Sequence, residues 1–288
     1  MPPKRRTFYE NQLIPLYDGY FPRPTPPDFP ELQEEPDKRL WLRTEEIFNL
    51  LKMGDFSRVE ELLEIYRKTE DGVLRATIRT LLGDAGTFSC FQQMREELEA
   101  ERKTQDKMAL YYYRDKASAY CDAFVNWGFL DAVPVIVDHY ITLRLARIKD
   151  VDYFPIMLSL MMEREWSLLA VEPPEDALEE YLGLVMHRYE ALCAQYGSGN
   201  VLVFNGELAS VKYFAHRLAH DLGPARRAEV DLRRRFEAST GIDCHDMFVD
   251  KVFQPLAAAR IAESFLNSPD AAKYEDGVRY FFGHRIPD

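Results

Sequence analysis

The stretch from Phe129 to Ala170 is the most apolar part of the chain and constrains the fold more than any other. It contains two segments that begin alike, Asp131-Ala132-Val133-Pro134 and Asp152-Tyr153-Phe154-Pro155, each with a proline where a first helical turn would start. Proline is tolerated there because the first N–H groups of a helix have no partner within the helix. We therefore predict two successive buried helices.

Apolar residues recur at helical spacing in both segments, which predicts one buried face on each helix. Charged residues interrupt both segments before either reaches the length of a bilayer span, which needs about 20 apolar residues. We therefore predict core helices of a soluble protein. The predicted faces comprise Val133, Val137, Ile141, Leu145 and Ile148 in the first helix, and Phe154, Leu158, Met161, Met162 and Leu169 in the second.

Amphipathic segments separated by helix stops fill the rest of the chain. Thr44 is predicted as an N-cap, Gly54 as a stop and Asp71 as the residue that opens the next helix. We count roughly eleven helices joined by short loops, so we predict an all-α fold. The short loops favour antiparallel helical hairpins stacked in an irregular HEAT/ARM-like solenoid. Further helices are predicted over 87–126 (two), 174–196, up to 222, up to 239 and over 245–266, with one extended run, 201–204, before an Asn205-Gly206 turn.

Residues 1–42 are predicted to form a proline-rich extended arm, and residues 43–288 the α-helical domain. Nine of the 17 prolines lie in the first 40 residues. That density disfavours helix and favours polyproline conformations. Because the arm also contains aromatic residues such as Tyr9, Tyr17 and Phe21, we predict that it packs on the helical body. A free ligand for a proline-recognition domain is the alternative.

The chain has a net charge of −12, from 48 acidic and 36 basic side chains. This charge repels nucleic acid phosphates and anionic membranes, so neither is an expected partner. A basic protein partner fits the charge, although many ordinary cytoplasmic proteins are equally acidic.

The four cysteines are far apart and form no Cys-x-x-Cys pair, which predicts free thiols in a reducing compartment, the cytoplasm. No apolar segment follows Pro2-Pro3-Lys4-Arg5-Arg6, so we expect neither a signal peptide nor a transmembrane anchor.

Seven carboxylates and one arginine lie between Glu163 and Glu180, around the Pro173-Pro174 loop. Loops at the ends of stacked hairpins are where helical-repeat proteins usually carry recognition residues. A solvated face without a function is the alternative. The predicted partner-binding residues are Glu172, Glu175, Asp176, Glu179 and Glu180.

His216 and His220 lie one helical turn apart, close enough to share a divalent metal ion. Metalloproteases with this spacing have a glutamate after the first histidine, whereas Arg217 stands here. A third ligand would have to come from Asp243 or His245. Two solvated histidines, with Asp243 capping the final helix, are the favoured interpretation, so no metal and no cofactor is predicted.

Sequence motifs of hydrolases, nucleotide-binding and dinucleotide-binding proteins do not occur, and no catalytic residue is predicted. Glu163, Glu165, Glu172 and Asp176 could form a carboxylate pair, but nothing around them predicts the desolvation that tunes a general acid. The main basic run, Arg226, Arg227, Arg233, Arg234 and Arg235, lacks aromatic residues for base stacking. It is predicted to pair with the acidic start of the 174–196 helix, with a phosphate-binding stripe as the alternative.

The segment from Asp71 to Gly86 resembles the second helix of a HEAT-type repeat. It has the aspartate, the Val73-x-Arg75 pair, the following Ala76 and the closing Leu82-Gly83-x-x-Gly86 of that pattern. The resemblance implies paired antiparallel helices and no particular activity. No fixed-period array is visible further along the chain.

The chain also resembles the immunity proteins of bacterial polymorphic toxin systems. The resemblance rests on the HEAT-like segment, the acidic balance and the closing Gly277-Val278-Arg279-Tyr280-Phe281-Phe282-Gly283-His284. It implies a cytoplasmic, non-enzymatic protein that blocks a basic toxin domain, with carboxylates facing a basic active-site groove. A helical scaffold or adaptor, and a metal-dependent enzyme using His216 and His220, are the alternatives.

Overall fold

The computed structural model describes residues 36–102, 107–163, 168–197, 201–220, 226–249 and 252–287. This part of the chain forms eleven α-helices and three short antiparallel hairpins, so the fold is all-α, as predicted. The chain divides into two compact units. Unit 1 comprises the described residues of Met1–Thr87 and Ser210–Asp288, and unit 2 comprises those of Phe88–Ala209.

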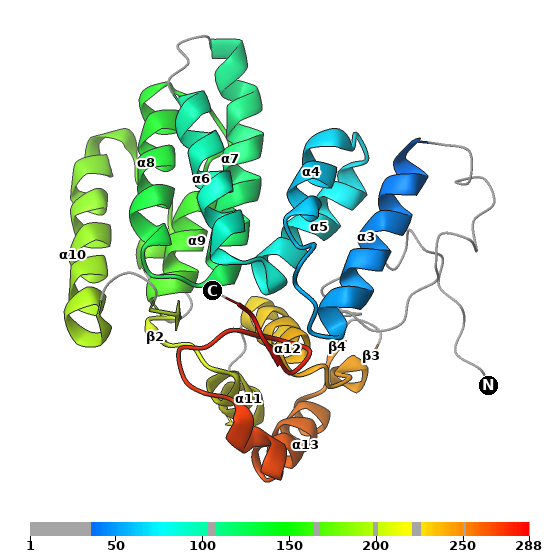
Figure 1. Ribbon diagram of the computed structural model, residues 1–288. Coiled ribbons are helices and arrows are strands. Elements are labelled where there is room, and N and C mark those ends of the chain that lie inside the picture. Colours follow the sequence, from blue (N-terminus) through cyan, green and yellow to red (C-terminus); the bar gives the residue numbers. More distant parts are fainter. Residues whose placement is uncertain are drawn as a thin grey trace. The chain divides into compact units, whose positions relative to one another are not determined.

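Unit 2 is a group of helices that lie side by side, with the last helix, α10, at its edge (Figure 1). One hairpin, formed by β1 and β2, follows α10 and contacts α9 through β1. The elements of unit 2 are α6 (Phe88–Arg102), α7 (Lys107–Trp127), α8 (Ala132–Leu145), α9 (Tyr153–Met162), η3 (Leu168–Ala170), η4 (Glu175–Ala177), α10 (Leu178–Tyr196), β1 (Val203–Phe204) and β2 (Glu207–Leu208).

The two apolar segments form α8 and α9, which confirms the prediction of two successive buried helices. The face predicted for α8 is wrong at Leu145, which is 75% exposed at the end of the helix, and Ile141 is only partly buried. Ile136, Tyr140 and Leu143 are buried in its place, because α8 is covered on more than one side. All five residues predicted to be buried in the second segment are buried: Phe154, Leu158, Met161, Met162 and Leu169.

Unit 1 is built from both ends of the chain. Helix α5 contacts both α12 and the strand β5, which lie far from it in the sequence. A solenoid is stabilised by contacts between successive repeats, so the solenoid part of the prediction is not established. The elements of unit 1 are α3 (Pro36–Lys52), α4 (Glu61–Lys68), α5 (Gly72–Ala85), α11 (Val211–His220), α12 (Arg226–Thr240), η5 (His245–Met247), β3 (Phe248–Val249), β4 (Val252–Phe253), α13 (Pro255–Leu266), η6 (Pro269–Lys273), β5 (Tyr280–Phe281) and β6 (His284–Arg285).

Helix α3 begins at Pro36, inside the range predicted as an extended arm, and a proline suits the first turn of a helix. Residues 1–35 of the predicted arm lie outside the described residues. The N-cap prediction for Thr44 is wrong, because Thr44 lies inside α3. Its hydroxyl donates to the carbonyl of Leu40 at 2.8 Å, one turn earlier.

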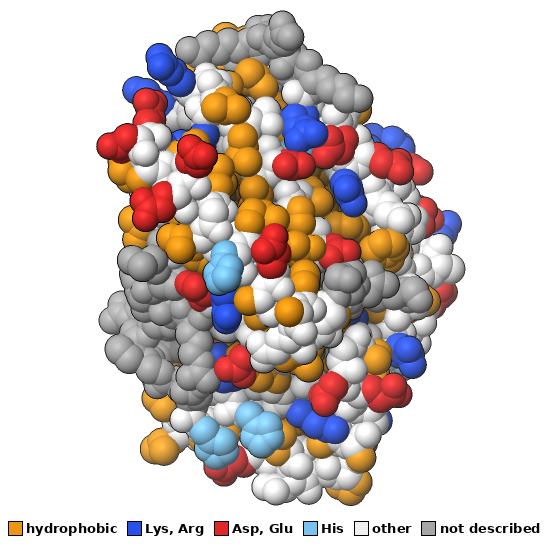
Figure 2. All heavy atoms as spheres, turned by 90° about the vertical axis from the view of Figure 1, so that its left-hand side faces the viewer, with side chains coloured by type: hydrophobic (Ala, Val, Ile, Leu, Met, Phe, Trp, Pro, Cys, Tyr) orange, Lys and Arg blue, Asp and Glu red, His pale blue; other side chains and the backbone are white. Residues whose placement is uncertain are grey.

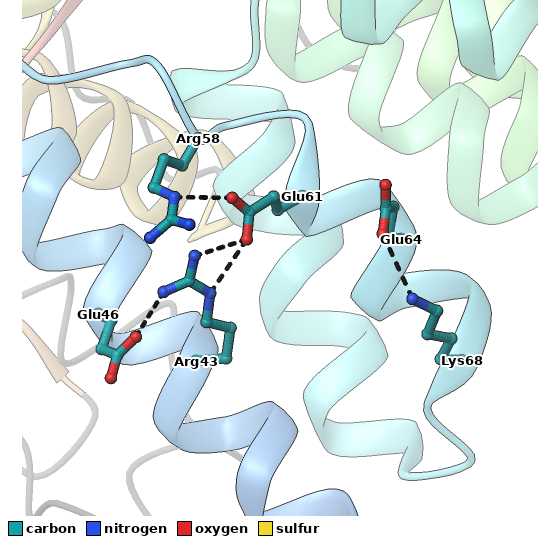
Figure 3. Close-up of polar contacts among 6 residues, drawn as sticks. All are labelled: Arg43, Glu46, Arg58, Glu61, Glu64 and Lys68. Carbon is teal, nitrogen blue, oxygen red and sulfur yellow. Dashed lines mark hydrogen bonds and ion pairs between the residues drawn. The ribbon is translucent and has the colours of Figure 1, made fainter.

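Helices α3 and α4 are linked by an exposed network of ion pairs (Figure 3). Arg43 donates from Nε and Nη2 to Glu61 Oε2 at 3.0 and 2.6 Å, and Arg58 donates to Glu61 Oε1 at 2.7 Å. The hydrogen bond from Arg43 lowers the pKa of the Glu61 carboxyl below its usual value. Exposed pairs contribute about 1 kcal/mol or less each, so burial of Ile47 and Leu62 stabilises this region more.

Helix α5 begins where the sequence predicts. Asp71 Oδ1 accepts hydrogen bonds from the N–H groups of Val73 and Leu74 at 2.8 and 3.2 Å, as an N-cap does. Its other oxygen, Oδ2, accepts one from Trp41 Nε1 of α3 at 2.8 Å. One carboxylate therefore both starts α5 and ties it to α3.

The helix predicted over 245–266 is wrong in its first half. These residues form η5 and the β3–β4 hairpin, and α13 begins only at Pro255. Proline is disfavoured in a helix interior and favoured in the first turn, so the helix cannot extend back through Pro255. Asp243 accordingly does not cap the final helix. Its Oδ1 accepts a hydrogen bond from the N–H of His245 at 2.8 Å in a local turn.

The four cysteines are free, as predicted, and Cys90, Cys121 and Cys244 are buried. Burial raises the pKa of the Cys121 and Cys244 thiols well above the ordinary value. Both thiols therefore stay protonated at neutral pH and act as small core residues.

The core of unit 2 contains a buried polar pair that the sequence did not predict. The Tyr113 hydroxyl of α7 hydrogen-bonds Nδ1 of His139 of α8, and both side chains are buried. Nε2 of His139 has no hydrogen-bond partner among the described residues. Burial, reinforced by the nearby charges of Arg102 and Arg95, lowers the pKa of His139 to about 4. His139 is therefore neutral at pH 7.

Candidate functional site

Helix α10 is attached to unit 2 along one narrow stripe. Only Tyr181, Val185 and Leu192 of its nineteen residues are buried. Spacings of four and seven residues place these side chains on one side of the helix. The Tyr181 hydroxyl donates to the carbonyl of Leu169 at 2.9 Å and anchors that side. The opposite side of α10 faces away from α8 and α9.

Four carboxylates gather where α10 begins. Glu175 and Asp176 lie in η4, Glu179 and Glu180 lie in the first turn of α10, and all four are exposed. Within the part of the chain that the structure describes, no basic side chain forms an ion pair with them. Carboxylates in a first turn are stabilised by the helix dipole, by about 0.3–1 kcal/mol each. We call these four residues the acidic cluster.

Glu172, predicted together with the acidic cluster, is engaged inside unit 2. Its Oε1 pairs with Nη1 of Arg144 of α8, and Nη2 of Arg144 donates to the carbonyl of Pro173 at 3.0 Å. The pair holds the loop before α10 against α8. Glu172 thus positions the loop, and the acidic cluster provides the available carboxylates.

The exposed side of α10 continues beyond the acidic cluster with small and apolar residues. Gly183 and Ala191 are exposed there, and Leu184 is 49% exposed. Figure 2 shows the molecule from the side of α10, and in its upper part acidic side chains are interspersed with hydrophobic ones. The surface at α10 therefore combines separate carboxylates with an apolar middle.

A polar cleft of about 770 Å³ lies in unit 2 between the C-terminal end of α10 and the β1–β2 hairpin. Arg188 is its cationic residue, and Nε of Arg188 donates to the carbonyl of Met162 at 3.0 Å. Glu163 and Glu207 line the same cleft. Because both signs of charge are present, the cleft suits a polar group that both donates and accepts hydrogen bonds better than a simple ion.

The predicted Asn205-Gly206 turn lines this cleft and is confirmed. Asn205 and Gly206 have φ values of +53° and +74° and join β1 to β2, a connection that Asn-Gly favours. A Cβ at Gly206 would lie 2.3 Å from the carbonyl oxygen of Met162, so only glycine fits. Asn205 Nδ2 donates to the carbonyl of Glu163 at 3.1 Å, which joins the turn to the end of α9.

Three residues of the arginine-rich run are buried inside unit 1, which contradicts the prediction that they pair with the acidic start of α10. Arg233, Arg234 and Arg235 of α12 are buried, with 0%, 2% and 6% exposure. Arg234 pairs with Asp84 of α5, and Nε of Arg233 donates to Glu237 Oε2 at 3.1 Å. A buried guanidinium needs a carboxylate close by, and both partners lie in unit 1. These three arginines are therefore core residues and form no phosphate-binding stripe. The side chains of Arg226 and Arg227 lie outside the part of the chain that the structure describes.

The 71–86 segment and the closing 277–284 segment contact each other in unit 1. Arg279, in the closing segment, donates from Nη1 and Nη2 to the carbonyls of Gly86 and Gly83 at 2.6 and 3.1 Å. These carbonyls lie at the C-terminal end of α5, where backbone acceptors have no partner within the helix. The HEAT-like segment and the closing segment thus have a shared structural role.

His216 and His220 lie on the exposed side of α11, with ring centroids 6.3 Å apart. The third ligand that the metal alternative requires does not join them. Across the described ranges, no group of three or more His, Cys, Asp or Glu side chains is arranged to hold a metal ion. Three of the carboxylates considered for acid–base chemistry have separate surroundings, since Glu163 lines the cleft, Glu172 pairs with Arg144 and Asp176 belongs to the acidic cluster. The fourth, Glu165, lies outside the described residues.

Neither the cleft nor the apolar middle of α10 is predicted from the sequence. Gly183 is the sequence feature that could have indicated the exposed face of α10. A glycine inside a helix lowers helix stability by about 1 kcal/mol relative to alanine, so its presence there needs a reason. A Cβ at Gly183 would meet nothing within 4 Å. Packing within the described chain therefore does not require glycine at this position.

No protein-family model, curated protein or solved structure matches this chain. Among the described residues, no helix has both the length and the apolar character needed to cross a bilayer.

Proposed function

We propose that this chain is a protein-binding protein without enzymatic activity, an immunity protein that neutralises a cognate toxin by covering a basic surface on it. The acidic cluster is the observation that carries the proposal. Its four exposed carboxylates have no ion-pair partner in the described part of the chain. The resemblance to immunity proteins of polymorphic toxin systems supplies the class of partner.

The electrostatic field of the chain favours a basic partner. A net charge of −12 attracts a basic surface, and carboxylates fixed at a helix terminus give that attraction a defined location. Complementary charge speeds encounter and selects the partner more than it adds affinity. Durable blocking also needs apolar contact, which Leu184 and Val171 offer at 49% and 65% exposure.

A helical adaptor is the second candidate, and a different observation favours it. The cleft beside Arg188 has polar walls of both charge signs, which suit the main-chain amide groups of a peptide. An adaptor of this kind would have several partners, whereas an immunity protein would have one.

Capture from a lysate of the native host, with mass spectrometry of the bound proteins, tests the proposal. Three forms of the chain are compared: the wild type, a variant without the acidic cluster, and a matched variant without four exposed carboxylates of unit 1. The substitutions are Glu175→Gln, Asp176→Asn, Glu179→Gln and Glu180→Gln in the first variant, and Glu263→Gln, Asp270→Asn, Glu275→Gln and Asp276→Asn in the second.

We expect the wild type and the matched variant to retain one stoichiometric basic protein, and the variant without the acidic cluster to lose it. High salt should release that protein, because salt screens exposed charges. Equal capture by both variants would contradict the proposal. Several weakly bound proteins would favour the adaptor.

A further inference from the structure

Helix α10 lies at the edge of unit 2 (Figure 1) and packs on α8, α9, η3 and η4. Its outer side is formed by residues at spacings of three and four, which share one face of a helix. These residues are Glu180, Gly183, Leu184, His187 and Ala191, and all of them are exposed.

Gly183 leaves this face of α10 without a side chain at its middle. It lies in the middle of α10, where glycine destabilises a helix, and a Cβ there would meet nothing within 4 Å among the described residues. A glycine in a helix interior allows another backbone to approach closely, and helices pack at about 8–10 Å between axes depending on the side chains at the contact. An external helix that lies against Gly183 would explain a glycine that the chain itself does not need.

The charges around this face indicate what covers it. The acidic cluster lies at one end, and Glu190, also exposed, lies toward the other end. Leu184 provides an apolar contact between them, with 49% of its surface exposed. An apolar stripe flanked by basic residues complements this pattern.

We propose that the partner contributes an amphipathic α-helix with lysine or arginine on its flanks, which packs lengthwise on the outer face of α10. This inference rests on the proposed function and specifies the contact. The partner helix comes closest at Gly183, covers Leu184 with its apolar stripe, and places its basic flanks beside the acidic cluster and Glu190. A second copy of this chain fits less well. A parallel pair would bring the two acidic clusters together, and an antiparallel pair centred on Gly183 would place Asp176 near Glu190.

Fluorescence anisotropy with defined peptides tests the proposal on the full chain. The main probe is a labelled peptide as long as α10, nineteen residues, composed of leucine, alanine and lysine with one leucine stripe. Two further probes have the same composition in scrambled order, or glutamate in place of lysine. The protein forms are the wild type, Gly183→Gln, and Gly72→Gln as a matched control, because a Cβ at Gly72 also meets nothing within 4 Å.

We expect the striped basic peptide to bind the wild type and Gly72→Gln with the same affinity. Its affinity for Gly183→Gln should be lower by a factor of about ten or more. Gly183→Gln should nevertheless unfold at a higher temperature than the wild type, because glutamine favours helix more than glycine does. A loss of binding together with a gain of stability excludes misfolding as the cause. The scrambled and acidic peptides should not bind.

Equal affinity of the striped peptide for the wild type and Gly183→Gln would overturn helix docking, as would no binding to the wild type. Self-association of the wild type that Gly183→Gln abolishes would replace the partner helix with a second copy. The proposed function is judged separately. If the variant without the acidic cluster still loses the captured host protein, the proposed function stands without helix docking.

Discussion

Unit 1 holds two pairs of charged residues in its interior, whereas unit 2 leaves a group of carboxylates exposed at its edge. In unit 1, Asp84 pairs with Arg234 and Glu237 pairs with Arg233, and all four side chains are almost fully buried. The acidic cluster of α10 has no such pair in the described residues. The comparison teaches that a run of charges in a sequence does not reveal its use. The densest basic run belongs to the core, and the acidic run is the one available to a partner.

The two units also divide the features that suggest a function. The 71–86 and 277–284 segments, on which the sequence prediction of an immunity protein rests, lie in unit 1 and contact each other through Arg279. The proposed binding surface lies in unit 2. The proposed binding surface can therefore be altered without removing the contacts of Arg279.

The largest expected effect comes from breaking a buried pair of unit 1. Asp84→Ala should lower the free energy of unfolding by about 3–5 kcal/mol, because it leaves the guanidinium of Arg234 buried beside an uncharged residue. Urea denaturation measures the loss. Glu61→Ala, in the exposed network of α3 and α4, is the control and should cost about 1 kcal/mol or less. Similar losses for both variants would contradict the contrast between buried and exposed pairs. In the double variant, adding Arg234→Met to Asp84→Ala should recover part of the unfolding free energy, because it removes the unpaired buried charge.

A second effect tests the buried polar pair of unit 2. Above pH 6.5, His139 is neutral in the folded and unfolded chain alike. As the pH falls from 6.5 to about 4, the unfolded chain takes up a proton at His139 that the folded chain does not, so stability decreases by an amount on the order of 3 kcal/mol. Urea denaturation across this pH range should therefore show a smaller loss for His139→Gln than for the wild type. His220→Gln, at an exposed histidine of α11, is the control. If the unfolding free energies of His139→Gln and the wild type depend on pH in the same way, the account of His139 is wrong.

A third, smaller effect concerns the carboxylate that starts α5. Asp71→Ala removes the hydrogen bonds to the N–H groups of Val73 and Leu74 and the one from Trp41, so we expect a loss of about 1–2 kcal/mol of unfolding free energy. Asp71→Asn keeps an acceptor at the cap and should lose less. If Asp71→Ala unfolds like the wild type, capping does not determine where α5 begins.

The smallest expected effect on stability comes from the acidic cluster. Glu179→Gln with Glu180→Gln removes two charges from the first turn of α10 and should cost no more than about 1–2 kcal/mol. Thermal unfolding measures this change. A much larger loss would mean that these carboxylates have a role inside unit 2, and the contrast with the buried pairs of unit 1 would disappear.

Features decided by local chemistry could be predicted from the sequence. Asp71, Gly54 and the Asn205-Gly206 turn act through their own backbone or the next few residues, and the structure confirms all three. The first half of the 245–266 helix was also open to local reasoning, since Pro255 lies inside the predicted range and excludes it.

Features decided by distant contacts could not be predicted. The burial of Arg234 depends on Asp84, which is 150 residues earlier in the chain. Likewise, the neutral state of His139 depends on its burial among the surrounding helices and on the charges of Arg102 and Arg95. In the candidate site, the carboxylates were evident from the sequence, but the separation of Glu172 from the other four required the position of Arg144. Periodicity shows that a helix has a polar face, and only the packed structure shows whether that face is paired.

The most direct test of the central claim is the affinity of the captured basic partner, measured against salt concentration for the wild type and the two carboxylate variants. The account predicts that the wild type and the matched unit 1 variant bind equally, with affinity that falls as salt rises. The variant without the acidic cluster should bind more weakly and depend less on salt. If removing the acidic cluster leaves both the affinity and its salt dependence unchanged, the partner does not bind at α10, and the central claim is wrong.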